Sequence, residues 1–100
     1  MRVAIRIRVS IRAGQYTFSH VTYDGPSDVL YAAVDRPRPG TRRETPEADV
    51  LRFDERGEFF GVILNNPRAR LEREGAVKLT LPSGELVRVQ GVEAAIRSDG

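Results

Sequence analysis

The sequence predicts a mainly β domain with a little helix (an α+β fold), built as an antiparallel meander of about five to seven strands. Two observations carry this prediction. Short segments rich in β-branched and aromatic residues recur along the chain, and turn motifs containing Gly, Pro or Asp separate them. The chain of 100 residues has the length of one domain, so we expect a single domain over residues 1–100.

Residues 3–12 give the clearest strand pattern. Five β-branched residues alternate with mostly polar ones: Val3, Ile5, Ile7, Val9 and Ile11. A period of two indicates a strand with one apolar and one polar face. A turn at residues 13–15 leads into a second β-prone run, residues 16–23, and the two runs predict a hairpin.

The next segments are a turn at residues 24–27 and a third strand at residues 29–34. The third strand is largely apolar, so we expect it in the centre of the sheet. Residues 36–43 contain Pro37 and Pro39 among four arginines. Proline has no N–H to donate to a strand ladder, so this segment is predicted to be an exposed loop and not a central strand.

Two further hairpins and two short helices complete the prediction. Strands at residues 48–53 and 58–64 flank a turn at residues 54–57, and strands at 76–81 and 85–90 flank a Pro-Ser-Gly turn. Asn66 and Pro67 indicate a helix start and Gly75 a helix end, which predicts one short helix near residues 67–74. Residues 91–100 are expected to carry a short C-terminal helix. The residues predicted to be largely buried are Ile5, Ile7, Val9, Leu30, Val34, Phe53, Val62, Leu64, Leu79 and Leu81.

Composition limits the class of protein. The chain has no cysteine, which excludes a disulfide scaffold, a thiolate zinc site and a cysteine nucleophile. This fits a reducing compartment, and we expect a cytoplasmic protein. The alternating N-terminus lacks the apolar run of a signal peptide, and no segment is long and apolar enough to span a bilayer, so no membrane role is expected.

No catalytic or metal-binding constellation emerges from the sequence. His20 is the only histidine, so a metal site in this chain would have no second histidine ligand. Asp24, Asp28 and Asp35 flank the third strand and could form a carboxylate cluster for Mg²⁺ or Ca²⁺, but their spacing does not match a calcium loop. The alternative is that Asp24 and Asp28 accept hydrogen bonds from backbone N–H groups in the turn. The sequence therefore predicts no enzyme and no cofactor.

Arginines are the strongest functional signal. Residues 1–43 carry a net charge of +5, residues 44–66 carry −4 and the remainder carries +1. The candidate contact residues lie on the polar side of the first strand and in the proline-containing segment: Arg6, Arg8, Arg12, Arg36, Arg38, Arg42 and Arg43. Together they would form a surface that attracts phosphates. Alternatively they keep the protein soluble and prevent pairing between strand edges.

The stretch from Tyr23 to about Leu71 resembles domain-of-unknown-function family 2283, a family of small bacterial proteins. The resemblance rests on Tyr23-Asp24, Asp28, Leu30-Tyr31 and, in the middle of the chain, on Asp54, Gly57 and the run Gly61-Val62-Ile63-Leu64. It covers about half of the chain and implies a compact antiparallel sheet with no assigned activity. It also implies an antitoxin-like or other interaction role. The chain departs from the family pattern at Ile63-Leu64-Asn65, where the family has an acidic residue.

The sequence thus favours a non-enzymatic protein-interaction module that forms a homodimer, with the first strand expected at the interface. A small sheet with one apolar face needs a second layer or a second copy to cover it. The alternative is a weak nucleic-acid-associated or antitoxin-like protein that uses the arginine-rich surface. An enzyme would need a carboxylate pair whose geometry the sequence does not show.

Overall fold

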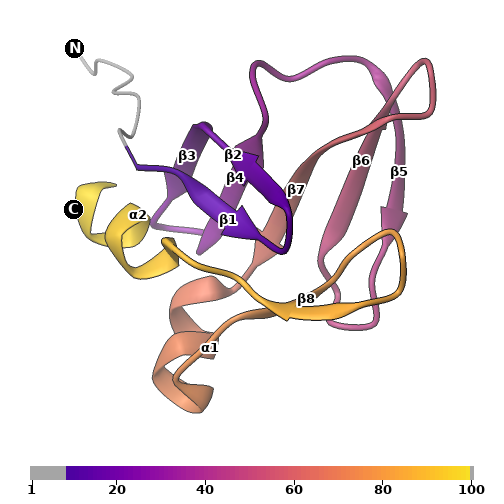
Figure 1. Ribbon diagram of the computed structural model, residues 1–100. Helices are drawn as coiled ribbons and strands as arrows, with labels where there is room; N and C mark the ends of the chain where they lie inside the picture. Colours follow the sequence, from indigo (N-terminus) through magenta and orange to yellow (C-terminus); the bar gives the residue numbers. More distant parts are fainter. Residues whose placement is uncertain (1–8, 100) are drawn as a thin grey trace, which may run out of the picture.

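A five-stranded antiparallel sheet is the main element of the chain (Figure 1). A computed structural model describes residues 9–99. In chain order, its elements are β1 (Ile11–Ala13), β2 (Tyr16–Phe18), β3 (His20–Asp24), β4 (Val29–Ala33), β5 (Gly40–Glu44), β6 (Val50–Asp54), β7 (Phe59–Asn65), α1 (Pro67–Glu74), β8 (Lys78–Thr80), β9 (Leu86–Arg88) and α2 (Val92–Asp99).

The strand order of the large sheet is β3-β4-β7-β6-β5, with antiparallel neighbours throughout. This confirms the predicted mainly β fold with an antiparallel sheet and short helices. It is not one continuous meander, however, because a β3–β4 hairpin and a β5–β6–β7 meander are joined by pairing between β4 and β7. These two strands are the most apolar in the sheet, so pairing them places both in its interior.

The described elements also differ from the prediction near the N-terminus. The run at residues 16–23 is not one strand, because it divides at Ser19 into β2 and β3, which belong to different sheets. The Ser19 hydroxyl, at the point where the chain enters the large sheet, donates to the carbonyl oxygen of Val34, which directly follows β4, at 3.0 Å. Within the described part of residues 3–12, only Ile11 and Arg12 lie in a strand, and the earlier residues of the predicted strand lie outside the described range.

The prediction of a loop over residues 36–43 is wrong for its second half. Residues 40–43 belong to β5, which pairs with β6 along its length. Both prolines precede the strand, and β5 is an edge strand that needs ladder partners on one side only. Gly40 allows the close approach, because a Cβ there would lie 1.9 Å from the Phe53 carbonyl oxygen.

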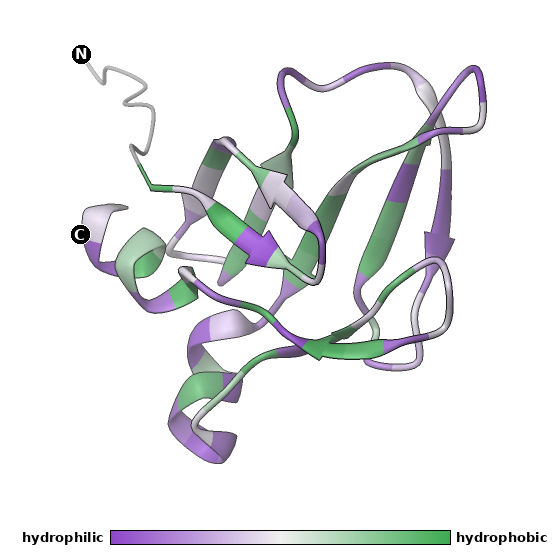
Figure 2. Ribbon diagram, viewed as in Figure 1, coloured by the Kyte–Doolittle hydropathy of each residue, from purple (hydrophilic) through white to green (hydrophobic). Residues whose placement is uncertain are grey.

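One face of the large sheet is covered by a second layer. The β1–β2 hairpin, the β8–β9 hairpin and α2 contribute Ile11, Phe18, Leu79 and Val92 to one buried cluster with the sheet (Figure 2). The predicted core residues Leu30, Val62, Leu64, Leu79 and Leu81 are buried there. Val9, Val34 and Phe53 are only partly buried, and Ile5 and Ile7 lie outside the described residues.

A buried ion pair connects α1 to the sheet. Asp49 is fully buried, and its Oδ1 accepts a hydrogen bond from Arg70 Nη1 at 2.7 Å. Arg70 also donates to the carbonyl oxygens of Asn65, at 3.0 Å, and Lys78, at 2.8 Å. One guanidinium group therefore joins the entry to β6, the end of β7, the helix and β8.

Among the described residues, no helix is both long enough and apolar enough to cross a membrane.

We predict that Arg70→Met destabilises the protein by about 3–5 kcal/mol, because it leaves the Asp49 carboxylate buried without its cation. Urea denaturation measures the loss. Arg73→Met is the matched control on the same helix, since Arg73 is exposed and should change stability by less than about 0.5 kcal/mol. A loss below about 1 kcal/mol for Arg70→Met would contradict a structural role for the pair.

Candidate functional site

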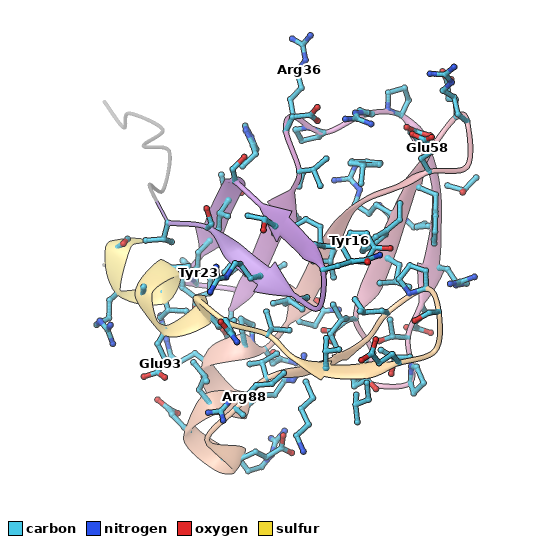
Figure 3. The ribbon with its side chains drawn as sticks, in the orientation of Figure 1. Tyr16, Tyr23, Arg36, Glu58, Arg88 and Glu93 are labelled. Carbon is cyan, nitrogen blue, oxygen red and sulfur yellow. The ribbon has the colours of Figure 1, made fainter. Side chains whose placement is uncertain are left out.

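The arginines that the sequence singled out do not gather on one surface within the described residues. Arg6 and Arg8 precede the described range. Arg12 lies on β1, in the second layer, and its Nη2 donates to Gln90 Oε1 at 3.2 Å. Arg36 lies in the loop between β4 and β5 and projects away from the body of the molecule (Figure 3).

Arg38 serves the internal structure of the sheet end. Its guanidinium contacts the carboxylates of Asp35 at 2.6 Å and Asp54 at 3.1 Å, and it lies 5.5 Å from the centre of the Phe60 ring. The hydrogen bond with Arg38 lowers the pKa of Asp35. Asp54 also accepts hydrogen bonds from the backbone N–H groups of Arg56 and Glu58, at 2.9 and 3.0 Å. These bonds explain why an aspartate stands at the first position of this turn. Arg38 is therefore largely neutralised within the chain.

Arg42 and Arg43 are neighbours on β5 and lie on opposite faces of the sheet. Arg43 stacks on Phe53 at 5.1 Å and approaches the Pro82 carbonyl oxygen at 3.5 Å, so it lies on the covered side. Arg42 lies on the other face, directly across from Arg52 of β6. Arg52 stacks on Phe60 at 5.1 Å. The second face thus brings Arg42 next to Arg52, which was not singled out from the sequence, and Arg52 shares the Phe60 ring with Arg38.

This second face of the large sheet, which we call the open face, includes two neighbouring rows of residues beside Phe60, whose ring Arg38 and Arg52 cover. The strand registers define the first row as His20, Ala33, Gly61, Arg52 and Arg42 and the second row as Thr22, Tyr31, Ile63, Val50 and Glu44. Tyr31 is 42% exposed, and Ile63 and Val50 are half-buried. No residue of either row belongs to the described core cluster.

A shallow hollow lies on the open face beside Tyr31. It has a volume of about 130 Å³, and its lining includes His20, Tyr31, Ala33, Pro37 and Arg52. Pro37 comes from the loop between β4 and β5, which therefore reaches over one end of this face. The small side chain of Ala33 leaves room for the hollow between the larger side chains of Tyr31 and Arg52.

The open face was not predicted from the sequence. Residues 29–34 are largely apolar and were therefore expected to form a central strand, with no distinction between its two faces. The signal that was missed is a weak alternation within β4, where Leu30 and Ala32 are buried while Tyr31 between them is exposed. A second strand of the same kind is β7, where Val62 and Leu64 are buried and Ile63 is not fully buried.

Asp28 has a structural role that extends beyond its own turn. Its Oδ1 accepts the backbone N–H of Arg68 at 3.0 Å and its Oδ2 that of Ala69 at 3.2 Å, so it caps the start of α1. The Tyr23 hydroxyl also donates to Oδ1, at 2.8 Å. Asn66, expected to be the cap, makes no side-chain capping hydrogen bond in the described structure, and its backbone lies in the left-handed region with φ 56°.

The other two carboxylates of the predicted cluster, Asp24 and Asp35, interact with different partners. Asp24 accepts a hydrogen bond from the Ser27 hydroxyl, and Asp35 pairs with Arg38. Over residues 9–99, no three His, Asp or Glu side chains are arranged to hold a metal ion. His20 lies half-buried at the hollow of the open face.

Comparison with known proteins gives no match among protein families, curated proteins or solved structures. The resemblance of residues 23–71 to family 2283 therefore stays a prediction.

We predict that Asp28→Asn lowers the free energy of unfolding by about 0.5–2 kcal/mol at pH 7, the usual value of a helix cap. Partial burial raises the pKa of Asp28, but hydrogen bonds from Arg68, Tyr23 and Ala69 outweigh burial, so the net pKa is lowered. A carboxylate whose pKa is lowered in the folded state contributes its full stabilisation of the fold at pH values above its pKa in the unfolded state, which is about 3.9. That stabilisation is lost as the pH falls through the folded-state pKa.

The cost of Asp28→Asn should therefore shrink between about pH 4 and about pH 2, as urea denaturation at each pH would show. Asp24→Asn is the matched control, because Asp24 is exposed in the same turn. Its effect should stay below about 0.5 kcal/mol. An equal loss for Asp28→Asn at both ends of this pH range would refute the charged cap.

Proposed function

We propose that this chain is a non-enzymatic protein-interaction module that associates with a second copy of itself through the open face of its large sheet. The observation that carries the proposal is the row of Tyr31, Ile63 and Val50, which lies outside the buried cluster. A sheet stabilised on one face only commonly gains from a second layer on the other. The absence of cysteine favours a reducing compartment, and we place the protein in the cytoplasm.

The roles of the charged residues support an interaction module over an enzyme. Asp28 caps a helix, Asp49 pairs with Arg70, and Asp54 holds a turn and Arg38. Each of these carboxylates is therefore engaged in holding the fold. An antitoxin-like role, as implied by the resemblance to family 2283, would be one use of such a module.

A second candidate function is weak binding to polyanions. Arg42 and Arg52 lie directly across from each other on neighbouring strands. Like charges at such positions repel, and a phosphate group placed between them would relieve the repulsion. The net charge of +2 and the acidic residues of the same sheet limit the number of phosphates that bind at once.

For the first proposal we expect light scattering at micromolar concentration to give twice the chain mass of 11.2 kDa. Burial of the second row from both copies provides the association free energy. Serial dilution should return the monomer mass, because a small interface dissociates at low concentration. A monomer mass throughout the micromolar range would refute self-association.

For the second candidate we expect weak retention on a heparin column at low salt. Engagement of about two or three phosphates of duplex DNA gives a slope of log affinity against log salt near −2 to −3. Arg42→Gln combined with Arg52→Gln should remove most of the retention. Arg73→Gln combined with Arg97→Gln is the matched control, since it removes equal charge from exposed positions on α1 and α2. Equal losses in both variants would show that net charge alone is responsible.

A further inference from the structure

We propose that two copies pack open face to open face about a two-fold axis that runs between and parallel to the two rows, so that the first row of each copy lies over the second row of the other. This inference rests on the proposed self-association and specifies its geometry. A two-fold interface must be self-complementary, which means that the same surface supplies both halves of every contact. The two rows of the open face meet this requirement in shape and in charge.

Large and small residues occupy adjacent positions on the open face. Tyr31 and Ile63 stand in the second row, and Ala33 and Gly61 stand next to them on the same strands in the first row. Residues two apart along a strand are about 6.7 Å apart on the same face. With the axis between the rows, Tyr31 of each copy enters the hollow over Ala33 of the other copy, and Ile63 lies over Gly61.

The hollow has suitable dimensions and lining for this contact. Its volume of about 130 Å³ is on the scale of one aromatic side chain, and its lining combines Ala33 and Pro37 with the polar groups of His20 and Arg52. Tyrosine presents an apolar ring and a polar hydroxyl, so it suits a pocket of this mixed character. Because Tyr31 also forms one wall of the hollow, each copy presents the projecting side chain directly beside the hollow that would accept Tyr31 of the other copy.

Charge fixes the position of the axis. Arg42 lies in the first row and Glu44 in the second row, both on β5 and both exposed. An axis centred on the first row would place Arg42 against Arg42 of the other copy, and an axis centred on the second row would place Glu44 against Glu44. Only the position between the rows brings each Arg42 to the Glu44 of the other copy, which makes two favourable contacts per dimer.

Pairing through the strand edges is the main alternative for a second copy. The free edge of the sheet at β5 carries Arg42 and Arg43 on its two faces. Antiparallel pairing of two β5 strands would bring these arginines close to their own copies. Charged side chains at a sheet edge discourage such pairing, so the face is favoured over the edge.

The test is charge reversal at the two exposed positions of β5. Arg42→Glu and Glu44→Arg each create two like-charged contacts in a homodimer, so each variant alone should be monomeric at concentrations where the wild type is dimeric. Mixing the two variants restores two opposite-charge contacts and should yield a mixed dimer. Carrying both substitutions on one chain should restore the homodimer. Sedimentation of each sample and native mass spectrometry of the mixture report the species present.

Two further variants test the hollow and provide controls. Tyr31→Ala should raise the dimer dissociation constant at least about tenfold, as expected for an aromatic side chain at the centre of an interface. Leu86→Ala is its control, because Leu86 is the other exposed large apolar residue among those described, at 55%, and lies on β9. Arg56→Glu, in the exposed turn between β6 and β7, controls for the charge reversals. Neither control should change the dissociation constant.

The outcomes separate this geometry from self-association itself. A wild type that stays monomeric overturns both proposals. A wild-type dimer that persists in Arg42→Glu, Glu44→Arg and Tyr31→Ala overturns the geometry alone. A dimer that is insensitive to these changes but is lost when residues 1–8 are deleted assigns the interface to the N-terminal segment instead. Recovery of association in the mixture and in the doubly substituted chain supports the axis between the rows.

Discussion

The buried ion pair of Asp49 and Arg70 is the interaction on which the arrangement of the molecule depends. Burial raises the pKa of Asp49, while the hydrogen bonds from Arg70 and the Asn65 N–H oppose that rise. Removing both charges from water costs several kcal/mol per ion. The contacts from Arg70 and the Asn65 N–H to Asp49 Oδ1 offset part of this cost, while Asp49 Oδ2 is buried without a hydrogen-bond partner among the described residues. Because Arg70 also reaches the carbonyl oxygens of Asn65 and Lys78, the pair allows one position of α1 relative to β7 and β8.

The position of α1 determines which face of the sheet is covered. The helix starts at the end of β7, where the Asp28 carboxylate accepts the backbone N–H of Arg68. It ends at Gly75, and the chain continues to β8. β8, β9 and α2 then follow on the same side as the β1–β2 hairpin, and their apolar residues join one cluster. Within residues 9–99, little apolar sequence is left for the opposite face. The open face is therefore a consequence of placing all of these elements on one side.

The sequence predicts those features that depend on neighbouring residues. Pro67 and Gly75 mark the limits of α1 because each acts within one turn of the helix, and residues 54–57 specify a turn through Asp54 and its adjacent N–H groups. The Asp28 cap was not predictable, since it joins residues 40 apart in the sequence. The same holds for the strand β5, which pairs because β6 offers a partner, although its own residues have no apolar alternation. The open face was missed because Ala32 and Ala33 make β4 look apolar on both sides.

The two proposed functions use the same residue and therefore oppose each other. In the proposed dimer Arg42 would contact Glu44 of the second copy, whereas a bound polyanion would need both Arg42 and Arg52. A polyanion that binds only the monomer lowers the concentration available for dimerisation, and by linkage dimerisation weakens polyanion binding by the same free energy. Salt would act unequally on the two equilibria. In the proposed dimer it would weaken the two Arg42–Glu44 contacts by screening, but not the burial of Tyr31 and Ile63. Phosphate binding would lose more, because salt reduces the counterion release that drives it. If both proposals hold, physiological salt should favour the proposed dimer, in which Glu44 of the second copy would relieve the repulsion between Arg42 and Arg52.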